Sequence, residues 1–428
     1  MVNENLLLAT KIYEMESVEQ LIIKTYKASA SLRKANDNQI IKALKMLADA
    51  VEANSTAILE ANSADVAKQD ADDTRTDRLR LNEQRIKNIA NSIRQISELP
   101  NPAGKLLEKR TLNNGLLLDK ISVPLGVVGA IYESRPNVTF DIATLCLRSM
   151  NGCLLKGSIE AENSNQAAVQ IIKKVLKDNN IDEECVTLLP SGRETVQQLY
   201  TATKYIDVLI PRGSDSLIQS VRKNSLVPVI ETGAGVCHIY VEKDAALDKA
   251  VNIVANAKVS RPSVCNAVDA ILVDRIAAPK FFEKLQPLFQ KYEVEIFADA
   301  EAHDLLKNYR HLHTATAEDF GREFLSLKCA VKVVENIDEA LLHIQKYSTK
   351  HSEAIVSENK DQCERFLQEV DAAVVYMNAS TRFTDGEEFG LGAEIGISTQ
   401  KLHARGPFAL EKLVSEKWII RGNGQIRG

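Results

Sequence analysis

Apolar residues recur at intervals of three and four along residues 17–100, where glycine and proline are scarce. This spacing is typical of amphipathic helices, because residues three and four apart lie on one face of a helix. The stretch ELPNPAG at residues 98–104 ends the pattern with residues that interrupt helices. The sequence therefore predicts a layer of helices before residue 105.

The hydrophobic pattern changes between residues 105 and 132. Asn114-Gly115 lies between two apolar-rich segments, which is a strong signal for a β-hairpin. Residues 121–132, ISVPLGVVGAIY, are almost continuously apolar and are expected to form one buried strand. A hairpin followed by a buried strand is thus predicted.

Short apolar segments then alternate with helical patterns. We expect strands at 153–158, 185–190, 206–214, 227–233 and 238–242, and helices at 163–178, at about 193–204 and before residue 227. A rhythm of strand and helix predicts a parallel sheet with helices on both faces.

The same rhythm restarts after Cys265 and predicts a second α/β domain. Its expected strands are 267–274, 292–299, 329–335, 351–358 and 372–378. The C-terminal segment is expected to form a helix and then a short strand around Trp418. A lone strand and an isolated hairpin suggest edge pairing, either within the chain or between subunits.

Composition narrows the class of protein. The chain has 428 residues, 45% hydrophobic and 26% charged, with a net charge of −5. This charge argues against nucleic-acid or membrane-surface binding, which usually depends on clustered cations. No apolar run is long enough to span a membrane, and the acidic start MVNENLLLATKIYEME does not resemble a secretory signal.

The seven cysteines are an odd number without C-x-x-C spacing. Neither a disulfide framework nor a thiolate metal site is therefore expected. We expect a cytoplasmic protein with reduced thiols and no bound metal.

Two loops are candidates for cofactor binding, although the chain has neither a G-x-G-x-x-G fingerprint nor a Walker A loop. Lys156 ends one expected strand, and Arg212, Gly213 and Ser214 end another just before a helix. Glycine beside a helix N-terminus offers backbone N–H groups to phosphate. Each loop could equally be an ordinary connection, so both alternatives stay open.

Two further polar residues follow buried strands. Asn137, in the polar loop expected at residues 132–141, offers an amide that could stabilise an oxyanion, but asparagine more often satisfies the backbone of a turn. Glu231 precedes a glycine-rich turn and could be either a functional carboxylate or a surface acid.

Cys265 is the best candidate for a nucleophile. The other six cysteines lie in apolar or helical surroundings, whereas Cys265 lies in the loop RPSVCNA at residues 261–267, near Arg261 and Asn266. A reactive thiol needs nearby positive charge or N–H dipoles to lower its pKa. Arg261 supplies a charge, and we expect that a helix beginning after Ser263 could supply dipoles.

Four motifs carry a resemblance that extends in order from about residue 20 to the end. They lie at residues 123–141, 229–241, 256–267 and 378–407. These motifs resemble those of the gamma-glutamyl phosphate reductase family, the proline-biosynthetic branch of the aldehyde dehydrogenase superfamily. The last two are long and specific to this branch.

The resemblance implies that NADPH reduces L-glutamate 5-phosphate to L-glutamate 5-semialdehyde with release of phosphate. It implies that Cys265 is the catalytic thiol, which forms a thioester, and that Asn137 is the oxyanion amide. Aldehyde-oxidising relatives keep a general base at the place of Glu231. An active base would hydrolyse the thioester here, so we expect at most a weak catalytic role for Glu231.

The resemblance also implies contacts with the cofactor. Glu323 corresponds to the acid that holds the nicotinamide ribose, and the remaining contacts are expected from Lys156, Ser158, Arg212, Gly213, Ser214, Glu231 and Gly233. NAD-specific relatives place an acid where this chain has Ile159, so NADPH is favoured here. Many relatives have Arg-Gly-Gly at the place of Lys156-Gly157-Ser158, which leaves the strength of this preference open.

The implied substrate is anionic, so cations are expected near Cys265. The loop arginines of the resembling motifs are Arg135, Arg261, Arg382 and Arg405. Arginine suits bidentate binding of carboxylate or phosphate. Any of them could instead make a structural contact with backbone or with another subunit.

The expected fold is α/β and aldehyde-dehydrogenase-like, with a Rossmann-type cofactor domain, an α/β catalytic domain and a small β oligomerisation element. The boundaries are 1–107 and 124–235, then 236–398, then 108–123 and 399–428. We expect a homodimer or homotetramer. Two alternatives remain: an aldehyde-oxidising or acylating dehydrogenase, and an inactive partner that scaffolds a glutamate kinase.

Overall fold

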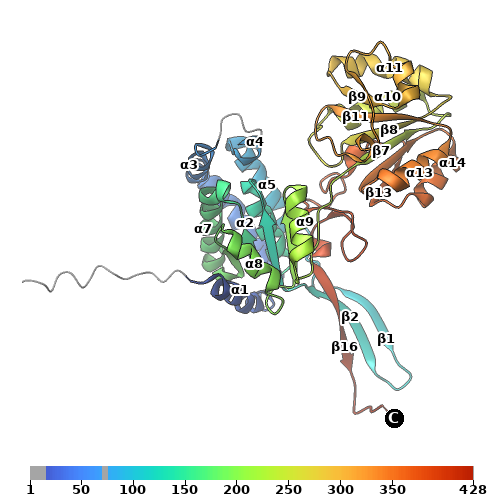
Figure 1. The fold of residues 1–428 in the computed structure, drawn as a ribbon. Helices are drawn as coiled ribbons and strands as arrows, with labels where there is room; N and C mark the ends of the chain where they lie inside the picture. Colours follow the sequence, from blue (N-terminus) through green and yellow to red (C-terminus); the bar gives the residue numbers. More distant parts are fainter. Residues whose placement is uncertain (1–15, 70–75, 428) are drawn as a thin grey trace, which may run out of the picture. The chain divides into compact units, whose positions relative to one another are not determined.

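The computed structural model describes residues 16–69 and 76–427. The expectation about a secretory signal falls on residues 1–15 and lies outside this part of the chain. Contacts between residues divide the chain into two compact units (Figure 1). The first unit contains residues up to Ser97, Pro124–Leu209 and Asn224–Pro228; the second contains Glu98–Val123, Ile210–Lys223 and Val229–Gly428.

Helices dominate the start of the first unit, as the three-and-four pattern predicted. They are α1 (Val18–Leu32), α2 (Asp37–Ala53), α3 (Ser55–Val66), α4 (Thr76–Leu79) and α5 (Glu83–Glu98). A capping box begins α1: Ser17 accepts the backbone N–H of Gln20, and the Gln20 side chain accepts the N–H of Ser17. The layer of helices that the apolar spacing predicted before residue 105 is therefore confirmed for the described residues.

A four-stranded sheet follows along the chain, and it lies in the first unit except for residues 210–212 at the end of its last strand. Its order is β5-β4-β3-β6, and its strands are β3 (Val127–Tyr132), β4 (Gly152–Lys156), β5 (Val186–Leu188) and β6 (Val208–Arg212). The helices that follow these strands are α6 (Pro136–Arg148), α7 (Glu162–Asp178), α8 (Arg193–Thr201) and α9 (Asp215–Asn224). β3 pairs in parallel with β4, and β4 with β5. The predicted strand and helix rhythm is confirmed.

The expected single strand at 121–132 is wrong, because the segment contains two strands. β2 (Leu117–Pro124) ends at a proline, and β3 begins three residues later. Gly126 has a φ of 132°, and the chain changes sheets at this point. The continuous apolar composition hid the break, since both strands are rich in aliphatic residues.

The predicted hairpin at Asn114-Gly115 is confirmed. β1 (Leu106–Thr111) pairs antiparallel with β2. The Leu112 N–H donates to the Leu116 carbonyl and closes the turn. The C-terminal strand β16 (Val414–Arg421) joins them in a three-stranded sheet of order β1-β2-β16. The expected edge pairing therefore occurs within the chain. The helix expected before β16 is only a 3₁₀ turn at Leu410–Lys412.

A seven-stranded sheet forms the centre of the second unit. Its order is β10-β9-β11-β8-β7-β12-β13, and neighbouring strands pair in parallel. The strands are β7 (Cys237–Val241), β8 (Val268–Asp274), β9 (Glu295–Ala298), β10 (Leu312–Thr314), β11 (Lys328–Val334), β12 (Ser352–Val356) and β13 (Val374–Met377). The expected second α/β domain is confirmed, whereas 227–233 is an extended segment rather than a regular strand.

Helices cover both faces of this sheet. They are α10 (Leu247–Val259), α11 (Ala278–Lys291), α12 (Ala300–Leu305), α13 (Ile337–Tyr347) and α14 (Lys360–Glu369). Alternate strand residues serve two cores: Ile239 packs in the core of α10 and α11, and Tyr240 in the core of α13 and α14. The central strands are consequently apolar on both faces, which explains their unbroken hydrophobic runs. A short pair of β14 (Gly396–Ser398) and β15 (Gly406–Phe408) lies outside this sheet.

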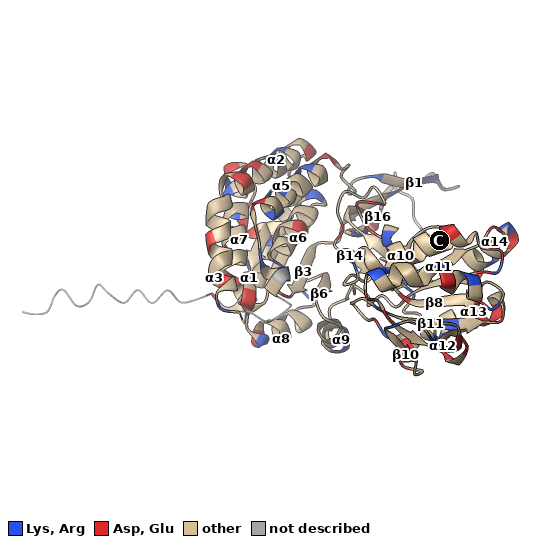
Figure 2. Ribbon diagram, turned by 90° about the horizontal axis from the view of Figure 1, so that it is seen from above, with Lys and Arg blue, Asp and Glu red and all other residues tan. Residues whose placement is uncertain are grey.

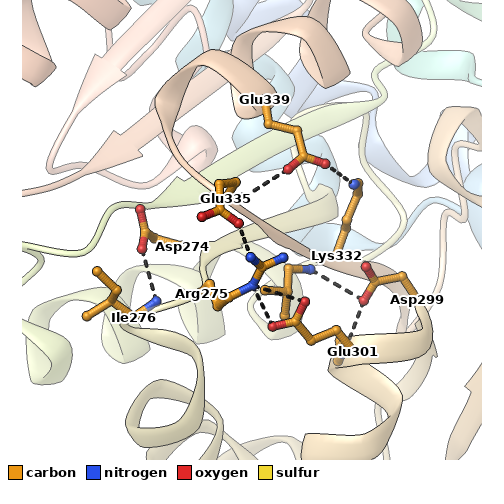
Figure 3. A network of polar contacts seen from close by, with 10 residues as sticks. Asp274, Arg275, Ile276, Asp299, Glu301, Lys332, Glu335 and Glu339 are labelled. Atoms are coloured by element: carbon orange, nitrogen blue, oxygen red, sulfur yellow. Dashed lines mark hydrogen bonds and ion pairs between the residues drawn. The ribbon is translucent and has the colours of Figure 1, made fainter.

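Ion pairs lie where β8, β9 and β11 end (Figure 3). Arg275 donates to Glu301 at 2.8 Å and pairs with Glu335, and Lys332 pairs with Glu339. The carboxyl ends of open parallel sheets are usual places for ligands. Here those three ends carry side-chain pairs, while the loop of Cys265 precedes β8 and lies at its amino end.

Charges are interspersed along the helices rather than gathered into one basic surface (Figure 2). No helix of the described residues is long and apolar enough to cross a membrane. The domain boundaries that we predicted stay a prediction; in the structure residues 98–107 and 210–223 belong to the second unit.

Candidate active site

Cys265 lies in a loop of turns between α10, which ends at Val259, and β8, which begins at Val268. The helix expected after Ser263 is absent, because the Ala267 N–H donates to Val264 and closes a turn instead. Cys265 is half-buried; the other six cysteines, all buried, are Cys146, Cys153, Cys185, Cys237, Cys329 and Cys363. Partial exposure thus separates the predicted nucleophile from the other thiols.

Gly235 allows the chain to pass directly against this loop. A Cβ atom at Gly235 would lie 1.6 Å from the carbonyl oxygen of Cys265, so no other residue fits without moving the loop. The Cys237 thiol, two residues later, donates to the same carbonyl at 3.2 Å. The backbone of the nucleophile is therefore held from the side of β7.

Asn266 fixes the other side of the loop. Its side-chain amide donates to the Thr384 carbonyl at 2.9 Å, and its side-chain oxygen accepts from the Arg382 guanidinium. The Thr381 hydroxyl donates to the Asn266 carbonyl at 2.7 Å. The 3₁₀ turn Thr381–Phe383 consequently holds the residue next to the nucleophile, although more than a hundred residues separate them in sequence.

Charged residues surround the Cys265 thiol. Burial raises its pKa to about 12, Glu323 and Glu394 raise it further, and Arg212 opposes them. The lowered pKa expected from the sequence is wrong for this arrangement, because carboxylates and burial outweigh the cation. The thiol must lose its proton before the sulfur can act as a nucleophile.

Glu323 is positioned by backbone contacts. Its carboxylate accepts the Gly235 N–H at 2.8 Å, and the next residue, Phe324, donates its N–H to Asp269 at 3.3 Å. Asp269 also pairs with Lys258 at 3.2 Å, and both side chains are buried. The predicted nicotinamide-ribose acid therefore lies within the same unit as Cys265, on a segment anchored to β8 and α10.

Arg212, at the end of β6, lies in the same group of charges as Cys265 and Glu394. A Cβ atom at Gly396 would lie 2.9 Å from the Arg212 guanidinium and 2.2 Å from the Thr232 side chain. Gly396 thus makes room for both side chains. Gly213 and Ser214 follow Arg212 and directly precede α9, as the phosphate-binding hypothesis requires.

Glu231 and Gly233 lie on a segment paired with β14. The Glu231 N–H donates to Gln400 at 3.0 Å, and the Gly233 N–H donates to Ile397 at 3.1 Å. The Glu231 carboxylate lies 3.8 Å from the Arg222 guanidinium. This ion pair with α9 occupies the carboxylate that aldehyde-oxidising relatives would use as a base.

The first unit holds Asn137 on a helix rather than in the polar loop that we expected. α6 begins at Pro136, and Arg135 is its N-cap residue. The Asn137 amide donates to Asp141, one turn further along, at 2.9 Å. Asn137 therefore has a fixed orientation in the first turn of α6.

Lys156 and Ser158 lie at the carboxyl edge of the first unit's sheet. Ser158 accepts the Ser134 N–H at 3.1 Å, which ties together the loops after β3 and β4. Burial lowers the pKa of the half-buried Lys156. Beside them a pocket of about 700 Å³ is lined by Gly157, Ser158, Asn165 and residues 187–191, among others. A nucleotide base and ribose fit a concave site of this size.

The loop arginines differ in their surroundings. Arg261 is exposed. Burial of Arg382 lowers its pKa, and the nearby positive charge of Arg261 lowers it further. Arg405 pairs with Asp371 at 2.7 Å, and Lys350 and Lys401 pair with the same carboxylate. Arg261 and Arg382 thus remain the substrate candidates on the Cys265 side, whereas Arg405 already has a carboxylate partner.

Sequence reasoning missed Glu394 and Gly235. Glu394 lies in the long motif at residues 378–407, but no local spacing distinguishes it from the exposed Glu387 and Glu388 nearby. No sequence motif or spacing distinguishes Gly235 from the other glycines. Among the described residues no group of three or more His, Cys, Asp or Glu is placed to hold a metal ion.

Comparisons with known proteins show the family to which the chain belongs. The aldehyde dehydrogenase family matches residues 2–303. The chain is 50% identical to a gamma-glutamyl phosphate reductase of Chlorobium phaeobacteroides, over 96% of this chain and 99% of that one. It is 47% identical to a gamma-glutamyl phosphate reductase of Bacteroides thetaiotaomicron, over 94% and 96%.

A solved structure is also similar over the full length. The crystal structure of gamma-glutamyl phosphate reductase from Thermotoga maritima has 40% identity and a TM-score of 0.93, and covers 96% of this chain and 100% of that one. An acetylating aldehyde dehydrogenase from Geobacillus thermoglucosidasius shares the fold, with 16% identity and a TM-score of 0.68. The chain belongs to the gamma-glutamyl phosphate reductases of the aldehyde dehydrogenase family.

Proposed function

We propose that this chain reduces L-glutamate 5-phosphate to L-glutamate 5-semialdehyde in proline biosynthesis. The observation that carries the proposal is the half-buried Cys265, held by Gly235 and Asn266 in the motif that resembles the family's catalytic loop. The family membership supports the same reaction. The semialdehyde then closes spontaneously to pyrroline-5-carboxylate.

Cys265 attacks the acyl phosphate, so that a carbon–sulfur bond forms and the bond to the phosphate oxygen breaks. Covalent catalysis of this kind divides the reduction into acyl transfer and hydride transfer. We assign the oxyanion contacts to the Asn137 amide and the Cys265 backbone N–H. Loss of one such donor typically lowers the rate by about 10²- to 10³-fold.

NADPH is the proposed cofactor, and when bound it supplies the hydride that reduces the thioester. The pocket beside Lys156 and Ser158 is concave and large enough for an adenosine, and Ile159 provides no acid that would repel a 2′-phosphate. Lys156 offers a charge partner for that phosphate. Arg212, Gly213, Ser214, Glu231, Gly233 and Glu323 are the further proposed contacts.

A reductase must prevent water from attacking the thioester. The ion pair between Glu231 and Arg222 supports this, because it engages the carboxylate at the place where oxidising relatives keep a base. For the substrate's anionic groups we propose Arg261 and Arg382, with Arg135 and Arg405 as weaker candidates. Run in reverse, the proposed reaction therefore requires phosphate, whereas a dehydrogenase that hydrolyses its thioester does not.

The test is the reverse reaction, with glutamate semialdehyde, phosphate and NADP⁺, for wild type and Cys265→Ala. We expect NADPH formation that depends on phosphate and falls by at least about 10³-fold in the variant, because the nucleophile is lost. NADPH formation without phosphate would instead favour an aldehyde-oxidising dehydrogenase. Absence of turnover by wild type, with folded protein, would favour the scaffolding alternative.

A homo-oligomer is also proposed. The three-stranded sheet exposes apolar side chains: Leu106, Leu107, Leu117, Trp418 and Ile420. Exposed apolar surface on a sheet with open edges favours pairing with a second copy. A glutamate kinase partner is consistent with the lability of an acyl phosphate and stays a prediction, as does the cytoplasmic location.

A further inference from the structure

One carboxylate of the first unit contacts a residue of the proposed reaction and has no role assigned to it. The Asn137 amide, which we proposed as an oxyanion donor, gives one hydrogen of its Nδ2 atom to Asp141 Oδ2 at 2.9 Å. Both residues lie on α6, four positions apart, so they share one face of the helix. Both are half-buried. The carboxylate of Asp141 is therefore in direct contact with an amide that the reaction uses.

Buried hydrogen bonds anchor the other face of α6. Thr139, two residues after Asn137, donates its hydroxyl proton to Asn165 Oδ1 on α7 at 2.8 Å. The same hydroxyl accepts from the Tyr132 hydroxyl at the end of β3, at 2.7 Å. These three bonded side chains are buried. The backbone of Asn137 is therefore fixed by its neighbours, and rotation of its side chain is the freedom that remains.

The loop after β4 supports the same turn. A Cβ atom at Gly157 would lie 2.2 Å from Asn165 Nδ2, so this loop packs against Asn165 with no room for a side chain. Ser158 accepts the Ser134 N–H at 3.1 Å, just before α6 begins. The start of α6 thus has several supports besides the bond to Asp141, which indicates that this bond is not what forms the turn.

The chemistry of an amide makes the identity of its partner important. An asparagine side chain ends in an oxygen and an N–H₂ group of similar size, and only the N–H₂ group stabilises an oxyanion. A carboxylate has acceptor oxygens alone, so it binds the N–H₂ group and not the amide oxygen. One Nδ2 hydrogen of Asn137 bonds to Asp141, and the second diverges from it. The contact therefore selects one of the two orientations of the amide.

We propose that Asp141 is a positioning residue for acyl transfer, which holds the Asn137 amide so that its second N–H meets the developing oxyanion. The charge of the carboxylate makes this hydrogen bond stronger than one between neutral groups. Asp141 acts through Asn137 and does not touch the substrate. This inference rests on the role of Asn137 in the proposed function and adds the residue that orients it.

A double-mutant cycle of Asp141→Ala and Asn137→Ala tests the proposal in the reverse assay. Asn137→Ala should lower kcat about 10²- to 10³-fold, because one oxyanion donor is lost. Asp141→Ala should lower kcat about 10- to 100-fold and leave KM within about twofold, because the amide loses its fixed orientation and the oxyanion exists only in the transition state. In the Asn137→Ala background, Asp141→Ala should change kcat by less than about twofold.

The cycle separates positioning from folding. A loss of stability would lower activity in both backgrounds, whereas a positioning residue has nothing to orient once the amide is absent. Asp141→Asn is the second variant, because its side chain keeps the size of Asp141 but can donate as well as accept. We expect its kcat to lie between those of wild type and Asp141→Ala.

Thr144→Val is the matched control on the same helix. The Thr144 hydroxyl is buried and has no hydrogen-bond partner among the described residues, so a methyl group in its place removes no contact. We expect its kcat to stay within about twofold of wild type. This control shows whether a substitution on α6 by itself disturbs the site.

A second assay does not depend on phosphate or on NADP⁺. The Cys265 sulfur attacks the ester carbonyl of p-nitrophenyl acetate, a carbon–sulfur bond forms, and p-nitrophenolate leaves. Cys265→Ala gives the background rate. The same cycle measured on this acylation should show the same losses, because it passes through an oxyanion on the same carbon. Wild type that is acylated but forms no NADPH with semialdehyde and phosphate would contradict the proposed function, and the acylation cycle would still decide the role of Asp141.

Four results would overturn the proposal. The first is a kcat for Asp141→Ala within threefold of wild type. The second is an equal loss in both backgrounds, which would make Asp141 a residue of the fold. The third is a raised KM with unchanged kcat, which would place Asp141 in contact with substrate. The fourth is a kcat for Asn137→Ala within threefold of wild type, because Asp141 would then orient an amide that the reaction does not use.

Discussion

At the scale of single residues, the environment of a side chain changes its chemistry more than its type does. Cys265 was singled out by its loop, but burial and two carboxylates raise its pKa instead of lowering it. For Lys156 burial lowers the pKa, because burial disfavours the charged form of a cation as it does that of a thiolate. An anion bound beside Lys156 would favour its charged form. Sequence motifs identified Cys265 and Lys156 as candidates. The residues that surround each side chain in the folded protein determine its pKa.

Lys156→Ala tests the proposed phosphate contact. We expect NADPH affinity to fall about 10- to 100-fold, the usual cost of a lost hydrogen bond to a charged group, while NADH affinity changes little. Fluorescence titration of each cofactor measures both. Lys173→Ala is a matched control, because Lys173 lines the same pocket but pairs with Glu184 at 2.7 Å. Equal losses for NADPH and NADH would contradict the assignment.

At the scale of elements, buried polar contacts attach loops to the sheets. Lys258 at the end of α10 donates to Asp269 on β8 and to the Ser326 carbonyl at 3.3 Å. Asp269 also accepts the Phe324 N–H, and burial raises its pKa to about 6. One buried ion pair therefore joins a helix, a strand and the segment that carries Glu323.

Lys258→Met should lower the free energy of unfolding by about 3–5 kcal/mol, because it leaves the Asp269 carboxylate buried without its cation. Guanidinium unfolding measures the change. The double variant Lys258→Met/Asp269→Leu should recover most of it, apart from about 1 kcal/mol for the lost Phe324 hydrogen bond. A single variant that costs less than about 1 kcal/mol would show that the pair contributes little.

At the scale of the whole molecule, the three-stranded sheet exposes apolar side chains that its own chain does not cover. Trp418 on β16 is 41% exposed, with Arg110 and Lys120 over its ring, and Ile420 is 57% exposed. Lys120 of β2 pairs with Glu416 of β16 at 2.7 Å, which holds the C-terminal strand on the hairpin. The sheet is thus well formed but leaves apolar side chains in contact with solvent.

Ile420→Glu should therefore lower the molecular mass observed by sedimentation velocity to that of one chain, because it places a charge in the proposed contact between copies. Ile276→Glu, at a position 74% exposed after β8, should leave the mass unchanged. An unchanged mass for Ile420→Glu would place the contact elsewhere or indicate a monomer.

The sequence by itself determined the elements and the chemistry of the reaction. Regular spacing predicted the helices of residues 17–100, the hairpin at Asn114-Gly115 and the strands of the second unit, because these depend on local periodicity and turn residues. The loop of Cys265 carried enough specific residues to indicate the family. The break within 121–132 was missed, since apolar composition does not show where a chain changes sheets.

The tertiary structure alone decided which residues surround the nucleophile. Gly235, Asn266, Glu323 and Glu394 come from separate segments, and their approach depends on close packing that no local pattern records. The same packing partly buries Cys265 and Glu394 and so raises the pKa of both groups. Burial and long-range contacts are properties of the folded chain, because distance along the sequence does not give distance in space.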